Sequence, residues 1–138
     1  MGSTHADYHT IQEAINAAKN DATIIVKNGS YNEIIVINKP ITLIGEDKNT
    51  TIINFNPDYK ISQVPILNIS ANNCSIENLQ ITLGNNAGSA MGIVLIDSKY
   101  NTIKNNIITN VTYGIYGINS KNNMIENNII TNVTNGVR

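Results

Sequence analysis

Residues 102–112 read TIKNNIITNVT, and residues 124–134 repeat them as MIENNIITNVT, 22 positions further along the chain. The segment GIYGI at 114–118 lies between the two copies, and Gly136 and Val137 begin its next copy. A repeat of this length is typical of one supersecondary unit that stacks on its neighbours, because a single unit cannot bury its own apolar face. The chain is therefore predicted to be a stack of similar coils.

Each repeat alternates isoleucine with polar residues in short runs, and Asn, Gly and Ser separate these runs. This alternation is typical of short strands with one buried face, and no run in the repeat is long enough for a helix. Asparagine suits the corners because it tolerates the left-handed backbone conformation. We predict an all-β fold, a parallel β-solenoid with three short strands in each coil.

The register of the repeat can be extended toward the N-terminus, with insertions such as residues 85–90 in the earlier coils. It predicts one outward column in which Glu77, Lys104 and Glu126 alternate in charge, an arrangement that stabilises neighbouring strands. It also predicts inward ladders of apolar side chains. These ladders are expected to contain Ile115, Ile93, Ile66 and Ile41; Ile118, Ile96, Ile69 and Ile44; and Ile125, Ile103, Ile76 and Ile52.

The N-terminal part of the chain predicts a cap for this stack. Residues 10–13 (TIQE) form a capping-box pattern, and apolar residues follow at helical spacing. We predict a helix over 10–19 that covers the first coil, because the end of a solenoid exposes its apolar interior. Residues 1–7 are expected to be a tag or a disordered N-terminus, and 8–138 a single β-helix domain with coils over 23–138.

The C-terminal end predicts an uncovered edge. The chain stops at Val137 and Arg138, in the middle of a coil. An edge strand presents unpaired backbone groups that can pair with another chain. We therefore expect either a fragment of a longer protein or self-association through this edge.

Composition excludes several classes of function. Charged residues make up 14% of the 138 residues and the net charge is −1, so there is no electrostatic case for binding nucleic acid or anionic membranes. No apolar run approaches the length of a membrane span, and no cofactor is predicted. Cys74 is the only cysteine, and the register places it at the corner position that Asn101 and Asn123 fill in later coils.

Three segments carry a resemblance to a known family. Residues 8–15 (YHTIQEAI), 24–33 (IIVKNGSYNE) and 41–45 (ITLIG) resemble the N-terminal module of pectin-lyase-like right-handed β-helices, including pectin methylesterases and periplasmic NosD-type repeat proteins. The later coils are similar to NosD-type repeats and to Asn-rich surface proteins and adhesins of methanogenic archaea. The resemblance covers 8–138, and it implies a right-handed parallel β-helix.

The resemblance also implies which types of residue would be catalytic. Related methylesterases use a pair of aspartates with an arginine and a glutamine on neighbouring coils. Here the only arginine is Arg138, and Asp97 has Ser70 and Asn119 as its counterparts in adjoining coils. Asp58 is far from Asp97 in the register, so no pair of carboxylates at catalytic spacing is predicted. We predict no catalytic residues.

Metal-binding patterns are weak. His5 and His9 precede the predicted helix, and no carboxylate cluster accompanies them as a transition-metal site would require. Glu46 and Asp47 supply two acids where calcium needs six or more oxygen ligands. We predict no metal site and interpret these residues as solvated.

Aromatic residues give the best candidate for a binding site. Tyr100, Tyr113 and Tyr116 fall within two coils, and tyrosine rings on a flat solenoid face can stack on sugars. Packing on the sheet is the alternative interpretation, since tyrosine is common in strands. We predict Tyr100, Tyr113, Tyr116 and the nearby Asp97 as ligand-binding residues, with a polysaccharide or a cell-wall glycan as partner.

These observations favour a non-catalytic, extracellular structural or adhesive β-helix module of a cell-surface protein, with carbohydrate as its ligand. The alternative is the N-terminal part of a polysaccharide lyase, esterase or epimerase whose catalytic residues lie beyond Arg138. A third hypothesis, a NosD-like accessory factor in copper-site maturation, predicts a cluster of His, Met or Cys ligands.

Overall fold

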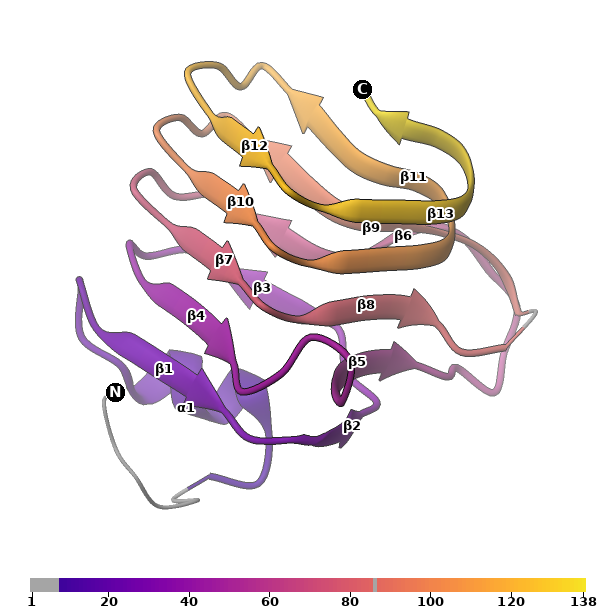
Figure 1. Cartoon of the computed structure of the whole chain (residues 1–138), viewed down its shortest axis with the longest axis horizontal. Coiled ribbons are helices and arrows are strands. Elements are labelled where there is room, and N and C mark those ends of the chain that lie inside the picture. Colours follow the sequence, from indigo (N-terminus) through magenta and orange to yellow (C-terminus); the bar gives the residue numbers. More distant parts are fainter. Residues whose placement is uncertain (1–7, 86) are drawn as a thin grey trace.

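A computed structural model describes residues 8–85 and 87–138 as a short helix followed by stacked β coils (Figure 1). The predicted tag or disordered segment at 1–7, which includes His5, lies outside the described residues. The coils make about four turns, so the predicted all-β solenoid with an N-terminal helix is confirmed. Among the described residues, no helix is long and apolar enough to cross a membrane.

The elements follow one another in a regular order. They are α1 (Ile11–Ala17), β1 (Thr23–Val26), β2 (Gly29–Tyr31), β3 (Ile35–Ile37), β4 (Thr42–Gly45), β5 (Thr51–Phe55), β6 (Ile61–Ile69), β7 (Ser75–Glu77), β8 (Gln80–Leu83), β9 (Gly88–Ile96), β10 (Thr102–Lys104), β11 (Ile107–Ile118), β12 (Met124–Glu126) and β13 (Ile129–Val137).

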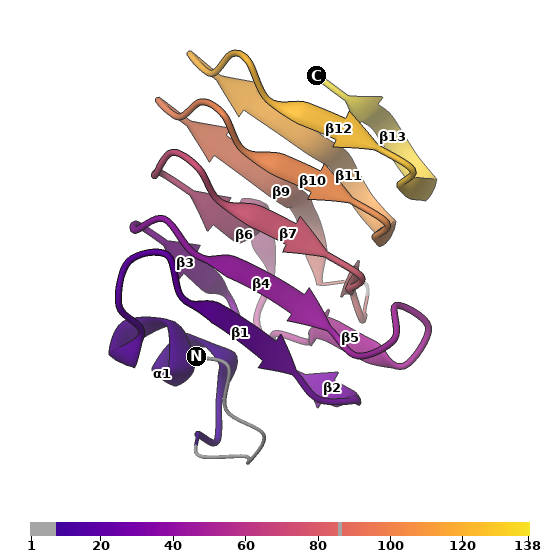
Figure 2. The same cartoon turned by 60° about the vertical axis from the view of Figure 1, so that its left-hand side comes forward.

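Three faces of parallel strands run along the stack. One face is a five-stranded sheet in the order β1-β4-β7-β10-β12, which comes forward in Figure 2. The other two faces form one eight-stranded sheet in the order β2-β5-β8-β11-β9-β6-β3, with β13 also paired to β11. They are joined because the long strand β11 pairs with β8 along its first part and with β9 along its last part.

The core consists of apolar side chains stacked from coil to coil. Ile76, Ile103 and Ile125 lie in register on the first face, as predicted, and Leu43 continues this ladder toward the N-terminus. Ile76, Ile103 and Leu43 are fully buried, whereas Ile125 in the last coil is 36% exposed. Coverage by a following coil therefore decides how deeply an inward residue is buried.

The outward column of charges is also confirmed. Lys104 pairs with Glu77 on one side and with Glu126 on the other. The Lys104 Nζ lies 3.8 Å from the Glu77 Oε1. Both side chains are partly exposed, so this ion pair contributes on the order of 0.5 kcal/mol.

The predicted register is wrong in the first two coils. Ile52 was expected below Ile76, but it lies on β5 and pairs with Gln80. Ile93 pairs with Leu67 and not with Ile66. In addition, Ile69 pairs with Leu95 and not with Ile96, Ile35 and Ile37 take the places predicted for Ile41 and Ile44, and Ile44 pairs with Glu77. Ile118 pairs with Ile96 as predicted, but it is 42% exposed and not inward.

These errors have a common physical cause. The early coils contain adjacent apolar residues, such as Ile66 and Leu67, both of which are fully buried. Alternation alone cannot decide which of two such neighbours enters a ladder. The pairing of β6 with β9 also shifts between Ile61 and Val64, where Gln63 adopts a φ of 57°. A bulge of this kind displaces the register by one residue.

Asparagine supplies most of the left-handed corners. Of the described non-glycine residues, twelve have positive φ, and eight of these are asparagines, which tolerate this conformation best after glycine. Other asparagines turn inward and bond to the coil below. The Oδ1 of Asn101 accepts the backbone N–H of Cys74 at 2.8 Å, and the Oδ1 of Asn123 accepts that of Asn101 at 2.9 Å. The predicted corner position of Cys74 is confirmed.

Helix α1 covers the first coil, as predicted, but it is shorter than the expected 10–19. Thr10 is its N-cap and accepts the N–H of Glu13, and the helix ends at Ala17 because Ala18 is already extended. Lys39 donates from Nζ to the carbonyls of Asn16 and Ala18 at 3.3 and 2.9 Å. A cation at this end satisfies carbonyls that the last turn leaves without partners.

The side chain of Gln12 joins the helix to the edge of β3. Its Nε2 donates to the carbonyl of Val36 at 3.0 Å, and its Oε1 accepts the N–H of Val36 at 2.7 Å. The amide thus replaces a neighbouring strand at an edge that would otherwise be unpaired.

Replacing Gln12 with alanine is expected to lower the free energy of unfolding by about 1–3 kcal/mol, since two hydrogen bonds to Val36 are lost. Urea unfolding followed by circular dichroism measures this change. Lys19→Ala is the matched control, because its exposed side chain has no bond to a described residue. Equal effects of the two substitutions would contradict the role assigned to Gln12.

Candidate ligand-binding turn

Two turns lie one above the other where the chain passes from the eight-stranded sheet into the five-stranded sheet. Residues 97–101 connect β9 to β10, and residues 119–123 connect β11 to β12; we call these the stacked turns (Figure 1). They are held in register by hydrogen bonds, including one of 3.1 Å from the N–H of Tyr100 to the carbonyl of Asn122. The 22-residue repeat therefore brings corresponding residues of the two turns together.

Tyr100 occupies a strained corner. Its φ is 60°, and the residues at the same place in the adjoining coils are Asn73 and Asn122, with φ of 60° and 59°. A bulky side chain in this conformation costs about 1–2 kcal/mol, whereas asparagine tolerates it. Tyr100 is nevertheless 55% exposed, so burial does not repay this strain. Its ring is approached by the Lys99 Nζ, 5.7 Å from the centroid.

Asp97 is tied to the turn above it. Its Oδ1 accepts a hydrogen bond of 2.7 Å from the Nδ2 of Asn119, and both residues have left-handed backbones. The two side chains lie in a cavity of about 320 Å³. The residues that line this cavity are Asp97, Ser98, Lys99, Asn119 and Lys121.

The sequence prediction did not include four of the residues that line this cavity, which are Ser98, Lys99, Asn119 and Lys121. Ser98 is buried, and its Oγ has no hydrogen-bond partner among the described residues. Lys121 pairs in register with Lys99 through an isolated parallel bridge. The 22-residue spacing of the two lysines was the signal in the sequence that could have revealed them.

Tyr113 and Tyr116 lie apart from the stacked turns, on the outer side of β11. Their rings stack on each other with centroids 5.3 Å apart and an interplanar angle of 23°. The guanidinium of Arg138 lies 5.4 Å from the ring centroid of Tyr113. Tyr113 is therefore in contact with two protein groups, and of the three predicted tyrosines Tyr100 offers the most exposed ring.

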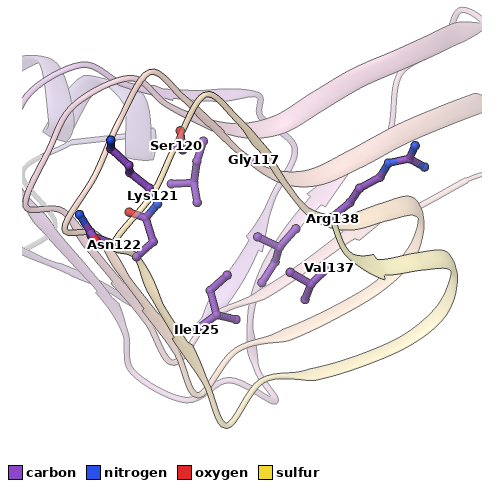
Figure 3. A pocket seen from close by; sticks show the side chains of 10 residues that line it. Gly117, Ser120, Lys121, Asn122, Ile125, Val137 and Arg138 are labelled. Carbon is purple, nitrogen blue, oxygen red and sulfur yellow. The ribbon is translucent and has the colours of Figure 1, made fainter.

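A second cavity, of about 200 Å³, opens at the end of the stack. Figure 3 shows Ile125 and Val137 at its apolar side and Lys121 and Asn122 at its rim. Its floor includes the buried core residue Ile115. This cavity is the top of the apolar core above the last coil.

The remaining candidates have local structural roles. Glu46 accepts the backbone N–H of Asn28, and Asp47 accepts that of Asn49. Burial raises the pKa of the Cys74 thiol, which disfavours the reactive thiolate. Among the described residues, no group of three or more His, Cys, Asp or Glu side chains could hold a metal ion.

Comparison with known proteins identifies the fold. No protein-family model matches the chain, and no curated protein matches it in sequence. A solved pectin methylesterase from Yersinia enterocolitica superposes with a TM-score of 0.58 at 18% identity, covering 89% of this chain and 54% of that one. A pectin methylesterase in complex with a hexasaccharide superposes with a TM-score of 0.59 at 18% identity, covering 94% and 53%.

This likeness supports the predicted class of structure, a pectin-lyase-like right-handed parallel β-helix. The chain spans about half the length of each of these enzymes. At 18% identity the similarity extends to the fold alone. The narrower resemblance to NosD-type repeats stays a prediction.

Proposed function

We propose that the chain is a non-catalytic polysaccharide-binding β-helix module of an extracellular or cell-surface protein, and that it contacts its glycan at the stacked turns. The observation that carries this proposal is the exposed ring of Tyr100 at a strained corner of the same turn as Asp97, whose side chain bonds to Asn119. Residues held in strained conformations cluster at functional sites, because the strain persists only where the surrounding structure enforces it.

The chemistry of the turn suits a sugar. The ring of Tyr100 offers an apolar face with a polar hydroxyl at its end, a combination that can stack on a pyranose. The Oδ2 of Asp97 makes no hydrogen bond with a described residue and can accept one from a sugar hydroxyl. We also propose that Tyr113 and Tyr116 extend the glycan-binding surface. The face of the Tyr116 ring that Tyr113 does not cover would contact the glycan.

The non-catalytic assignment rests on the lining of the cavity. Hydrolysis of glycosidic bonds requires two carboxyl groups at defined spacing, and among the residues lining this cavity only Asp97 is acidic. The enzymatic alternative is supported by the comparison in length, because this chain spans only about half of each similar solved enzyme. In that case the catalytic residues would lie on further coils, and the full-length gene would encode Asp, Arg and Lys in one outward column.

Self-association through β12 and β13 is a separate proposal. Met124 and Ile129 on these strands are 54% and 48% exposed, whereas α1 covers the opposite end of the stack. A second copy would therefore pair with this end only, as a closed dimer and not as a filament. Analytical ultracentrifugation tests this, and a monomer at all concentrations would exclude it.

Tyr100→Asn is expected to weaken glycan binding at least tenfold while raising the free energy of unfolding by about 1 kcal/mol, since asparagine relieves the strain of the left-handed backbone. Electrophoresis in native gels that each contain one soluble polysaccharide measures binding, and urea unfolding measures stability. Tyr59→Asn is the matched control, because Tyr59 is also exposed, at 61%, but lies far from the stacked turns in the register. Unchanged retention of Tyr100→Asn by every polysaccharide that binds the native protein would refute the assigned site.

A further inference from the structure

Lys99 and Lys121 are two like charges at corresponding positions of the stacked turns. The two lysines lie directly in register on adjacent coils. Neither makes an ion pair with a described residue, and the contact of Lys99 with the ring of Tyr100 involves no anion. The column of Lys104 is different, because there the charge alternates from coil to coil. Like charges directly opposite one another are destabilising, so this pair calls for a compensating group.

Other groups converge on the same cavity. Ser98 is 2% exposed, lines the cavity, and has an Oγ without a partner among the described residues. A buried hydroxyl normally finds a hydrogen-bond partner, because leaving it unpaired costs the full desolvation penalty. The lining of the cavity therefore combines two lysine residues with an unsatisfied hydroxyl.

We propose that this cavity binds a tetrahedral oxyanion, a sulfate or phosphate group, between Lys99 and Lys121. The charge of the two lysines favours this ligand. Lysine binds phosphate as a point charge with three donors, and two lysines together match the charge of a divalent oxyanion better than that of a single carboxylate. This inference deepens the proposed function. It rests on that proposal only for the polysaccharide, which would carry the sulfate or phosphate group as an ester. Free inorganic ions test it without that polymer.

The negative charge of Asp97 weakens the binding of an oxyanion in this cavity. The two lysines and one aspartate give the cavity lining a net charge of +1, and Asn119 donates to only one of the Asp97 oxygens. Removing the negative charge should strengthen oxyanion binding. Asp97→Asn is therefore expected to tighten the binding of inorganic sulfate about fivefold, the effect of one charge at short distance near a solvated surface.

The experiment is a titration of the whole chain with sodium sulfate and sodium phosphate at low ionic strength, followed by amide chemical shifts. We expect saturable shifts confined to 97–101 and 119–123, with sodium chloride at matched ionic strength producing none. The double variant Lys99→Gln/Lys121→Gln should lose at least tenfold in affinity and gain a few degrees in Tm, because the repulsion is relieved. Lys60→Gln, at an exposed lysine in a distant loop, is the control and should bind as the native chain does.

Two comparisons distinguish an ester on a polymer from a free ion, and a tetrahedral oxyanion from a planar carboxylate. Dextran sulfate binding that exceeds dextran binding, and that the double variant loses, supports an ester on a polymer, while binding of the inorganic ions alone supports a free ion. Equal shifts with acetate, or equal losses in Lys60→Gln and the double variant, would overturn the proposal. Unchanged glycan retention in Tyr100→Asn would overturn the glycan site alone, and the absence of saturable shifts with sulfate and phosphate would overturn the oxyanion site alone, so the two proposals fail separately.

Discussion

Asn106→Ala is expected to lower the free energy of unfolding by about 2–4 kcal/mol, because it leaves a buried donor unpaired and removes further hydrogen bonds. Asn106 is fully buried at a corner of the stack. Its Oδ1 accepts the backbone N–H of Leu79 at 2.9 Å, and its Nδ2 donates to the carbonyl of Ile76 at 3.0 Å. Alanine fills the space less well and can make neither bond. Urea unfolding of the purified variant measures the change.

Asn105→Gly is the matched control for this substitution. Asn105 is the neighbouring residue and has a φ of 58°, a conformation that glycine adopts freely. Its side chain makes no hydrogen bond with a described residue, so we expect a change of less than about 1 kcal/mol. A loss of stability in Asn106→Ala no larger than in Asn105→Gly would show that the inward asparagines do not hold the coils together.

Ile76→Ala is expected to cost about 2–5 kcal/mol, the range for a large-to-small substitution in a closely packed core. Ile76 is fully buried in the ladder between Leu43 and Ile103, and neither neighbour can move into the space without breaking strand pairing. Chemical denaturation again provides the measurement. The same substitution at Ile125 should cost less, since that side chain is already 36% exposed.

Ile25→Ala completes this series. Ile25 points outward from β1 and is 43% exposed, so its truncation should change stability by less than about 1 kcal/mol. The expected order of cost is therefore Ile76, then Ile125, then Ile25. Equal costs at Ile76 and Ile25 would contradict the assignment of the inward face.

The last coils were the most predictable part of the fold. Residues 102–112 and 124–134 are nearly identical, and near-identity at a constant spacing leaves one register that pairs like with like. In the first coils the spacing changes, and neighbours such as Ile66 and Leu67 are equally apolar. The sequence then allows more than one register, and closure of each coil on its neighbour selects among them.

The candidate site was predictable only in part. Asp97 and Tyr100 were recognised from their chemistry, and the structure places both on one turn. Lys99 and Lys121 were missed, although their spacing equals the repeat. The contacts of Tyr113 with Tyr116 and with Arg138 were not predicted, because side-chain packing depends on rotamers that a linear pattern does not encode.

By itself the sequence determined that this protein is a capped stack of parallel coils, because hydrophobic alternation and a constant repeat are properties of the chain alone. Only the tertiary structure decided which apolar residues share a ladder in the early coils and which polar groups meet at the stacked turns. The reason is physical. Paired strands of adjacent coils join residues 19 to 33 positions apart, and insertions alter that distance without changing the local pattern.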